Sequence, residues 1–301
     1  MLQLPQLYKK CHDLLEQTMT GQFEMTHLET RIIKLIELIN KERKRGIQSN
    51  SLLQRMQYLF DHSLWTDAVE YIDRSDFPAI DKCKIVNGLH KKNELFGTYK
   101  RFLTIISPYI HAINHNENRA CKILEIAGGS GQLAFFLANQ AEQQSLKVDI
   151  TSSDIVEQYV IASKEKALQN NTSVKFRQID ALSLNTLPKG EYDLIINLHS
   201  LHHFSAVQLA KIFNGAQAIA TQAFVAIDAF RGIRNLLFIA GSALIPSIIS
   251  LNSMYIHDAW ISARKMYPEM LLEIIAKIAC PASRINVNHP SIGLTALIIE
   301  S

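Results

Sequence analysis

The sequence of 301 residues contains few cysteines and no strong excess of either charge. Its four cysteines, Cys11, Cys83, Cys121 and Cys280, lie far apart, and no C-x-x-C pair occurs. This spacing argues against a zinc site and favours reduced thiols in the cytoplasm. Lys and Arg number 31 against 28 Asp and Glu, and the basic runs are short. Because a nucleic-acid-binding surface normally needs a broader basic face, we expect no nucleic-acid partner.

The sequence also lacks a convincing membrane segment. Its amino terminus has no basic stretch followed by an apolar one, so no secretory signal is expected. Residues 236–251 form an apolar run of 16 residues without a charge, and Pro246 interrupts it. A bilayer span needs about 20 such residues. The run therefore predicts a buried helix or a cavity wall, and contact with a membrane surface is the alternative.

The first third of the chain has helical periodicity and no clear strand pattern. Leu28, Ile32, Leu35 and Ile39 recur at spacings of three and four, which is typical of one buried helix face. Further helices are predicted over 51–60, 63–72 and 98–110. We therefore expect an all-helical region over 1–116 that acts as a lid, binds substrate or mediates a homodimer.

From Lys122 the pattern changes to alternating strands and helices. Strands are predicted over 122–127, 147–154, 174–180, 192–198, 223–228, 282–288 and 293–300. This alternation predicts an α/β domain over 117–301 with a mostly parallel sheet covered on both faces. The last two strands are joined by only four residues, which is too short for a crossover helix, so one strand is expected to run antiparallel.

A turn rich in small residues follows the first predicted strand, in the stretch "LEIAGGSGQLAFFLA". Residues without bulky side chains allow unusual φ values and let a ligand approach the backbone. The start of the next helix offers unpaired N–H groups to a carboxylate or phosphate. The turn fits the G-x-G-x-x-G pattern of dinucleotide sites poorly, and a tight turn without any ligand is the simplest alternative.

Two acidic residues extend this pattern along the chain. Asp154 ends the second predicted strand, 23 positions after Gly131, where a carboxylate would meet a ribose diol. Asp180 ends the third predicted strand and could accept a hydrogen bond from an adenine amino group. Their order after the glycine turn favours a nucleoside-containing ligand over a bare turn.

The segments "ILEIAGGSG", "SSDIVEQYVIASKEKA", "FRQIDAL" and "YDLIINLHSLHHF" resemble successive motifs of the class I S-adenosylmethionine-dependent methyltransferases. The resemblance covers about residues 122–301 and implies a seven-stranded Rossmann-like sheet with the last strand antiparallel. It also implies S-adenosyl-L-methionine as cofactor. By motif position, the implied cofactor-binding residues are Glu125, Ala127, Gly129, Gly131, Asp154, Ile155, Asp180, Ala181 and Asn197.

Within this set the resemblance implies different partners for different residues. Glu125 and the glycine turn would line the methionine part, Asp154 the ribose, and Asp180 with Ala181 the adenine. Asn197 would lie at the amino-acid end. Ala127 stands where the first glycine of the family's E-x-G-x-G-x-G pattern is expected.

The segment after the fourth predicted strand bears on the methyl acceptor. It has no N-P-P-Y or D-P-P-Y motif, which marks many enzymes that methylate nitrogens of DNA and protein. "NLHSLHHF" is instead similar to methyltransferases of quinone and natural-product pathways. This likeness implies a small, apolar or aromatic acceptor, methylated at oxygen or carbon.

Four residues are predicted near the transferred methyl group: His203, Asp228, His257 and Asp258. They follow the fourth and fifth predicted strands or lie in an H-D-x-x-x-S-x-R stretch similar to that of some small-molecule methyltransferases. His199, His202 and His203 suggest a metal site, because His199 and His203 are four apart, but no cysteine or additional histidine cluster completes a ligand set, so no metal is expected. Two alternatives stay open, a protein methyltransferase and a non-catalytic protein that binds the cofactor or its demethylated product.

Overall fold

A computed structural model describes most of the chain. The described residues are 5–18, 25–48, 51–64, 66, 68–74, 76–231, 253–291 and 293–301. The apolar run 236–251 lies outside them. No helix within these ranges combines the length and the apolar character needed to cross a bilayer.

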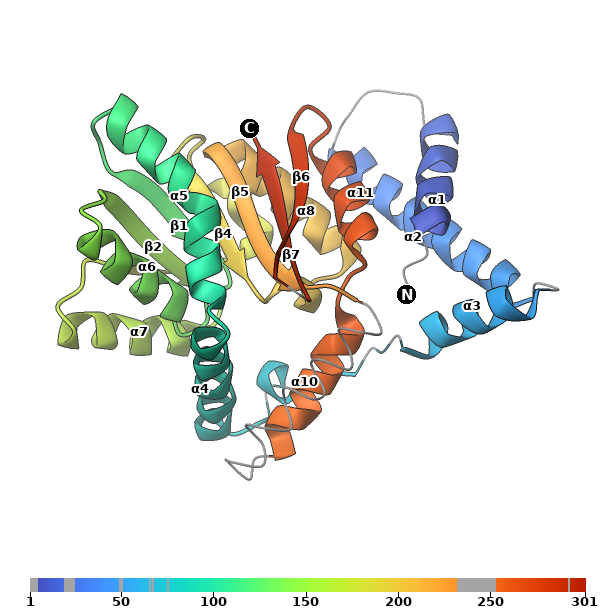
Figure 1. Ribbon diagram of the computed structural model, residues 1–301, viewed down its shortest axis with the longest axis horizontal. Helices are drawn as coiled ribbons and strands as arrows, with labels where there is room; N and C mark the ends of the chain where they lie inside the picture. Colours follow the sequence, from blue (N-terminus) through green and yellow to red (C-terminus); the bar gives the residue numbers. More distant parts are fainter. Residues whose placement is uncertain are drawn as a thin grey trace.

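Seven strands form one sheet in the order β3-β2-β1-β4-β5-β7-β6 (Figure 1). Pairing is parallel from β3 to β5, whereas β7 runs antiparallel to both of its neighbours. The predicted seven strands and the single reversed strand are thereby confirmed. The strands are β1 (Cys121–Glu125), β2 (Val148–Asp154), β3 (Lys175–Gln178), β4 (Tyr192–Leu198), β5 (Ala220–Ala229), β6 (Arg284–Ser291) and β7 (Leu294–Glu300).

The strand order reverses between β1 and β4. β2 and β3 follow on one side of β1, and β4 and β5 lie on the other. In β4 all of residues 192–197 are buried, as expected for a central strand covered on both faces. In open α/β sheets, ligands bind beyond the carboxyl ends of the strands at such a reversal.

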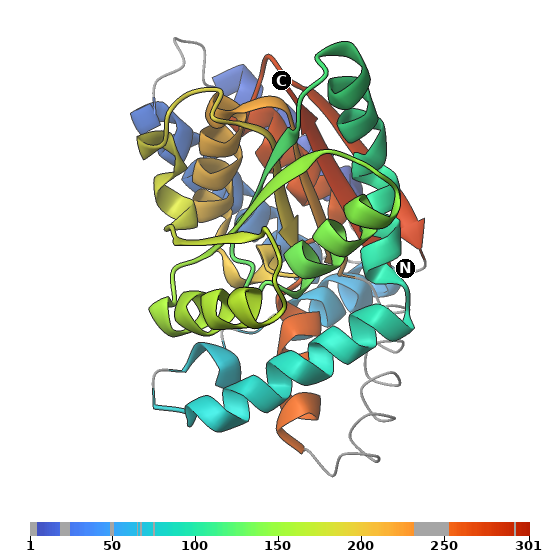
Figure 2. The same cartoon turned by 90° about the vertical axis from the view of Figure 1, so that its left-hand side faces the viewer.

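One face of the sheet is covered by α5 (Thr98–Asn116), α6 (Gln132–Gln143) and α7 (Glu157–Gln169) (Figure 2). Phe102 and Ile106 of α5 are fully buried against this face together with Leu133 of α6. The predicted helix over 98–110 is confirmed and continues for two more turns. Residues from the first third of the chain thus form part of the core under the sheet.

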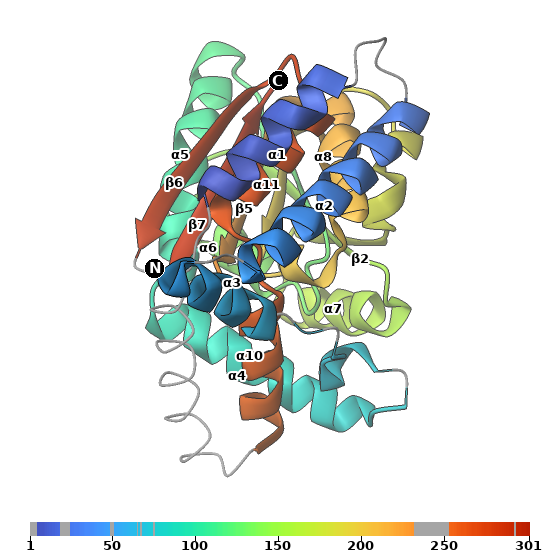
Figure 3. The ribbon, with the colours of Figure 1, turned by 90° about the vertical axis from the view of Figure 1, so that its right-hand side faces the viewer.

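The opposite face is covered by α8 (Ala206–Ile219) and α11 (Glu269–Ala279). Outside them lie α1 (Pro5–Thr18) and α2 (Met25–Ile47), as Figure 3 shows. The predicted apolar face of α2, Leu28, Ile32, Leu35 and Ile39, is buried in the same core as α8 and α11. Because this face needs a partner, α2 folds against the sheet domain.

The remaining elements lie beyond the carboxyl ends of the parallel strands, below the sheet in Figure 1. They are α3 (Leu52–Leu64), the short 3-10 helix η1 (Tyr71–Asp73), α4 (Ala79–Leu95) and α10 (Ser253–Lys265). Helix α10 contacts α4 and η1, and also η3 (Leu201–His203), a 3-10 turn after β4.

The predicted helix over 63–72 is wrong. α3 ends at Leu64, and the described residues from there to Glu70 are not helical. The backbone N–H groups of Tyr71 and Ile72 donate to the Asp258 carboxylate at 2.8 and 3.1 Å. A helix through this segment would need the same groups for its own carbonyls, so a contact from α10 overrides the local pattern.

Candidate active site

The glycine turn between β1 and α6 has the left-handed backbone that its small residues allow. Ala127, Gly129 and Gly131 have φ values of 49°, 55° and 66°. A methyl group added to Gly131 would overlap the Phe176 ring, whereas one added to Gly129 would meet no atom within 4 Å. The turn is therefore packed tightly at Gly131 and open at Gly129.

Asp154 ties the end of β2 to this turn. Its carboxylate accepts the N–H of Gly129 at 2.8 Å and the N–H of Val156 at 2.9 Å. Burial raises the pKa of Asp154, and the hydrogen bonds from the backbone N–H groups oppose this shift. The result is a buried carboxylate beside the open part of the turn.

Glu125, the last residue of β1, lies under the same turn. It is 3% exposed, and its Oε2 accepts the Ser152 hydroxyl at 2.5 Å. Burial raises the pKa of Glu125 to about 7, and the neighbouring charge of Asp154 adds to this effect. The turn thus rests on two carboxyl groups with little solvent.

The other predicted cofactor residues surround the same edge of the sheet. Asn197, at the end of β4, donates to the carbonyl of Ile126 at 3.0 Å, while its buried Oδ1 has no hydrogen-bond partner among the described residues. Asp180 accepts the N–H of Leu182 at 2.9 Å and so caps the 3-10 helix η2 (Ala181–Thr186). Ala181 is buried, and Ile155 is exposed beside Asp154.

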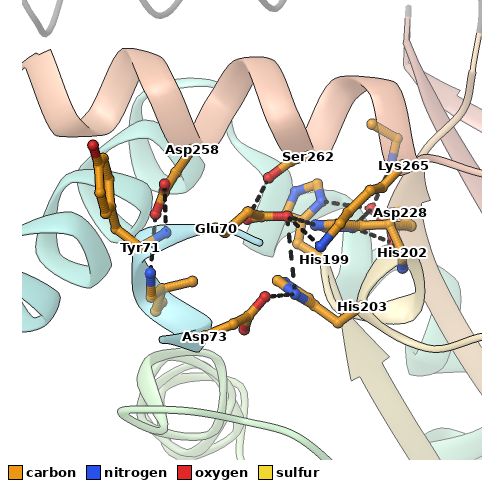
Figure 4. Close-up of polar contacts among 12 residues, drawn as sticks. Glu70, Tyr71, Asp73, His199, His202, His203, Asp228, Asp258, Ser262 and Lys265 are labelled. Carbon is orange, nitrogen blue, oxygen red and sulfur yellow. Dashed lines mark hydrogen bonds and ion pairs between the residues drawn. The ribbon is translucent and has the colours of Figure 1, made fainter. Parts of the chain in front are cut away.

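A second polar cluster lies beyond β4 and β5, with Asp228 and His202 at its base (Figure 4). The Asp228 carboxylate accepts the backbone N–H of His202 at 3.1 Å and lies 2.9 Å from Nδ1 of its ring. Burial alone would lower the pKa of His202, but the Asp228 carboxylate outweighs it and raises this pKa to about 9. Burial opposes ionisation of Asp228, yet His202 and His199 lower its pKa below the usual range.

Glu70 enters this cluster from the first third of the chain. Its Oε2 accepts the Ser262 hydroxyl of α10 at 2.7 Å. Its Oε1 is buried without a hydrogen bond and lies 4.0 Å from both His202 Nε2 and His203 Nδ1. Lys265 Nζ is 3.9 Å from the same oxygen. Figure 4 shows these groups converging on Glu70 from two other segments, η3 and α10.

The sequence was compared with known families and structures. A family described as "Methyltransferase domain" matches residues 123–222, which contain the glycine turn, Asp154, Asp180 and Asn197. Residues 123–222 therefore carry a methyltransferase domain. No curated protein matched the sequence.

Solved structures agree with the methyltransferase fold. The plantazolicin methyltransferase BpumL in complex with SAH is 14% identical with a TM-score of 0.55, covering 83% of this chain and 100% of its own. The plantazolicin methyltransferase BamL, in complex with a triazolic desmethylPZN analog and SAH, is 13% identical with a TM-score of 0.52. The BamL match covers 73% of this chain and 91% of BamL.

Of the four residues predicted near the transferred methyl, the methyltransferase brings His203 and Asp228 into one cluster. His203 Nδ1 is 3.0 Å from Asp73 Oδ2, and Asp228 pairs with the neighbouring His202. Asp258 is buried, and its carboxylate is occupied by the N–H groups of Tyr71 and Ile72. His257 is exposed beside it, with its ring centroid 4.2 Å from that of Tyr71.

The polar cluster also contains residues that sequence reasoning did not select. His202 is the buried partner of Asp228, although the prediction preferred His203 next to it. Glu70 stands 132 positions before His202, and nothing in its local sequence distinguishes it from a helix-surface carboxylate. The prediction of a helix over 63–72 places Glu70 on a helix surface. In the structure 68–70 are not helical, and the Glu70 side chain is buried in the cluster.

Proposed function

We propose that this methyltransferase transfers a methyl group to a hydroxyl oxygen of a small, apolar or aromatic molecule. The observation that carries this proposal is the His202–Asp228 pair at the carboxyl ends of β4 and β5. An unactivated hydroxyl needs a group that removes its proton, and the neutral form of a histidine paired with a carboxylate serves this purpose in enzymes. Because the pKa of His202 is about 9, the neutral form increases as pH rises toward 9, and turnover should rise with it. A carbon acceptor is the alternative that the experiment below tests.

The glycine turn and its carboxylates fit S-adenosylmethionine. The space at Gly129 admits a ligand against the backbone, and Glu125 would face the positively charged methionine end. Asp154, held by Gly129 and Val156, keeps free acceptor capacity for the ribose hydroxyls. Ile155 offers an exposed apolar side chain to the adenine, next to Asp180 and Ala181.

The bound cofactor supplies a methyl group made electrophilic by its sulfonium. The protein then has to align the acceptor oxygen with that methyl and to activate it, because no covalent enzyme intermediate is needed. In the proposed transfer the acceptor oxygen would give its proton to a base of the polar cluster and form the O–CH3 bond, while the S–CH3 bond would break and leave its electron pair on sulfur. We assign the activation to the cluster of Glu70, His202, His203 and Asp228.

We further propose that the helical residues 1–116 contribute the acceptor side of the site. Glu70 and Asp73 support this role, because they contact Ser262 and His203 from the segment between α3 and α4. Sequestering the cluster from water would strengthen its electrostatic interactions. In this role the helical part is a cover that also supplies side chains, and 117–301 is the methyltransferase domain.

The test combines product analysis with one variant. The protein is incubated with methyl-labelled S-adenosylmethionine and an ultrafiltered small-molecule extract, and the labelled product is analysed by mass spectrometry and NMR. We expect an O-methyl product, and we expect His202→Ala to lower turnover by about 100- to 10,000-fold with unchanged SAH affinity. His289→Ala, a surface histidine paired with Glu269, is the matched control.

Three results would contradict the proposal. A C-methyl or N-methyl product would exclude the hydroxyl acceptor. Label transferred only to polypeptide would favour a protein methyltransferase. A His202→Ala variant with wild-type turnover would remove the cluster from the chemistry.

A further inference from the structure

The polar cluster contains three metal-ligating atoms around one point. Glu70 Oε1 and one ring nitrogen each of His202 and His203 all lie within 4.8 Å of one another. Glu70 and His202 are buried, and His203 is partly buried. The three residues come from two segments far apart in the sequence, so the fold itself builds this grouping.

The Glu70 carboxylate is incomplete without a further partner. It is 3% exposed, and its Oε1 accepts no hydrogen bond among the described residues. Three groups that carry or can carry a proton surround this oxygen at 3.9–4.0 Å, which is too far for a hydrogen bond. A buried carboxylate oxygen without a partner costs free energy, so something that binds it would stabilise the site.

Two of the three side chains are oriented by a second hydrogen bond. Asp228 binds Nδ1 of His202 and leaves its Nε2 facing Glu70. Ser262 binds Oε2 of Glu70 and leaves Oε1 facing the two histidines. A carboxylate behind a histidine and a hydroxyl behind a carboxylate are the usual second-layer contacts of metal ligands.

Charged groups also surround this point. Glu70 and Asp228 are buried carboxylates in the contact network, and Asp73 is an exposed one. The positive charges beside them are Lys265, 3.9 Å from Glu70 Oε1, and the proton that Asp228 favours on His202. Buried carboxylates need compensating positive charge. A divalent cation between Glu70 and the two histidines would supply it.

We propose that Glu70, His202 and His203 bind one divalent transition-metal ion, with zinc as the best match. Two imidazoles and one carboxylate form the ligand set of catalytic zinc sites that keep a fourth position open. Ligands about 2.1 Å from a tetrahedral ion lie about 3.4 Å apart. The two oxygen–nitrogen pairs now separated by 4.0 Å would close by about 0.6 Å, and the two ring nitrogens, within 4.8 Å of each other, by up to about 1.4 Å, through side-chain rotations. The ion would also replace the hydrogen bond that His203 Nδ1 shares with Asp73 Oδ2 at 3.0 Å.

This ion would deepen the proposed function, on which its catalytic role rests. Bound at the open fourth position, an acceptor hydroxyl would have its pKa lowered by the metal. Its proton would leave to solvent, and the metal-held oxygen would form the O–CH3 bond as the S–CH3 bond breaks. The two histidines would then act as ligands of the ion. The ion, and not a histidine base, would activate the acceptor hydroxyl.

The test is a titration of chelator-treated, full-length protein with Zn²⁺, followed by calorimetry, and with Co²⁺, followed by visible absorption. We expect one ion per chain and cobalt bands of a tetrahedral or five-coordinate site. Glu70→Gln and His203→Ala should each weaken Zn²⁺ binding by more than about 100-fold. Ser262→Ala should weaken it by about 10- to 100-fold, because it only orients Glu70.

Lys265 provides a variant with the opposite expected sign. Its ammonium competes with the ion for Glu70 Oε1, so Lys265→Met should tighten Zn²⁺ binding severalfold. His289→Ala, which removes an exposed histidine paired with Glu269, should leave the affinity unchanged. Circular dichroism and SAH binding confirm that each variant is folded.

Two results would overturn the site. One is wild-type protein that binds less than about one-tenth of an equivalent of Zn²⁺. The other is Zn²⁺ affinity that is unchanged in both Glu70→Gln and His203→Ala. Because the titration needs no acceptor, bound zinc with an N-methyl or C-methyl product would leave the site standing and contradict only the proposed function. No zinc binding together with an O-methyl product would contradict the metal site and leave the proposed function standing.

Discussion

At the scale of single residues, the methyltransferase places carboxyl groups where water is scarce, and their titration changes accordingly. Glu125 shows this most clearly, because its pKa of about 7 exceeds the ordinary value of 4.5. The folded protein keeps the Glu125 proton over a pH range in which the unfolded chain has released it. Stability therefore falls as pH rises from about 4.5 to about 7 and levels off above that.

Glu125→Gln should remove this dependence. Relative to wild type, the variant without cofactor should gain about 2–4 kcal/mol of unfolding free energy at pH 8 and nearly nothing at pH 4.5. Its affinity for S-adenosylmethionine should fall, because the positively charged methionine end loses a carboxylate. Urea unfolding at several pH values, with the exposed Glu142→Gln as control, measures the difference. A constant difference across this range would show that Glu125 is ionised throughout.

At the scale of elements, the segment 68–74 takes its shape from α10. Asp258 accepts two backbone N–H groups of η1, and Ser262, one turn further along α10, fixes Glu70. The non-helical path of 68–70 and the position of η1 after it therefore depend on α10. Asp258 is a positioning residue for Glu70 in this arrangement.

Asp258→Ala should free this segment. The partly buried N–H groups of Tyr71 and Ile72 would lose their acceptor, at a cost of about 0.5–1.5 kcal/mol each. Hydrogen exchange of the amides of Tyr71 and Ile72 should accelerate by at least about tenfold, while amides in β4 and β5 stay unchanged. His289→Ala, at an exposed histidine paired with Glu269, is the control and should leave the exchange rates as they are. Equal rates in Asp258→Ala and wild type would separate the segment from α10.

At the scale of the whole molecule, the helical first third and the sheet share their cores. Leu35 of α2 is fully buried in one cluster with α8 and α11, and Phe102 of α5 is fully buried in the cluster on the other face. No large interface separates two independent cores here. The described part of the chain should therefore unfold as one cooperative unit.

Leu35→Ala tests this at a distance from the site. The cavity should cost about 2–5 kcal/mol, and calorimetry should show one transition at a lower Tm. Bound SAH should raise the Tm of wild type and variant alike, because both halves unfold together. Leu52→Ala, at an exposed leucine of α3, is the matched control. Two separate transitions, with only the first shifted by Leu35→Ala, would show that the helical part folds independently.

The sequence by itself determined the sheet and the turn of small residues at 127–131. Buried runs such as residues 192–197 need cover on both faces, and alternation with helices then leaves little choice but parallel strands. Likewise, the small residues at 127–131 predict a turn with positive φ values, which few side chains tolerate. Both features can be predicted from short stretches of sequence, because hydrophobic periodicity and backbone conformation are local properties.

Only the tertiary structure decided which polar groups meet. Glu70 lies far from His202 in sequence, and its segment was predicted to be helical. In the structure the N–H groups of Tyr71 and Ile72 donate to Asp258 of α10 instead of to helix carbonyls. The choice of His202 over His203 as the partner of Asp228 likewise depends on how η3 sits against β5. Hydrogen bonds between distant segments leave no periodic trace in the chain, because each needs only one side chain at the right place in the fold.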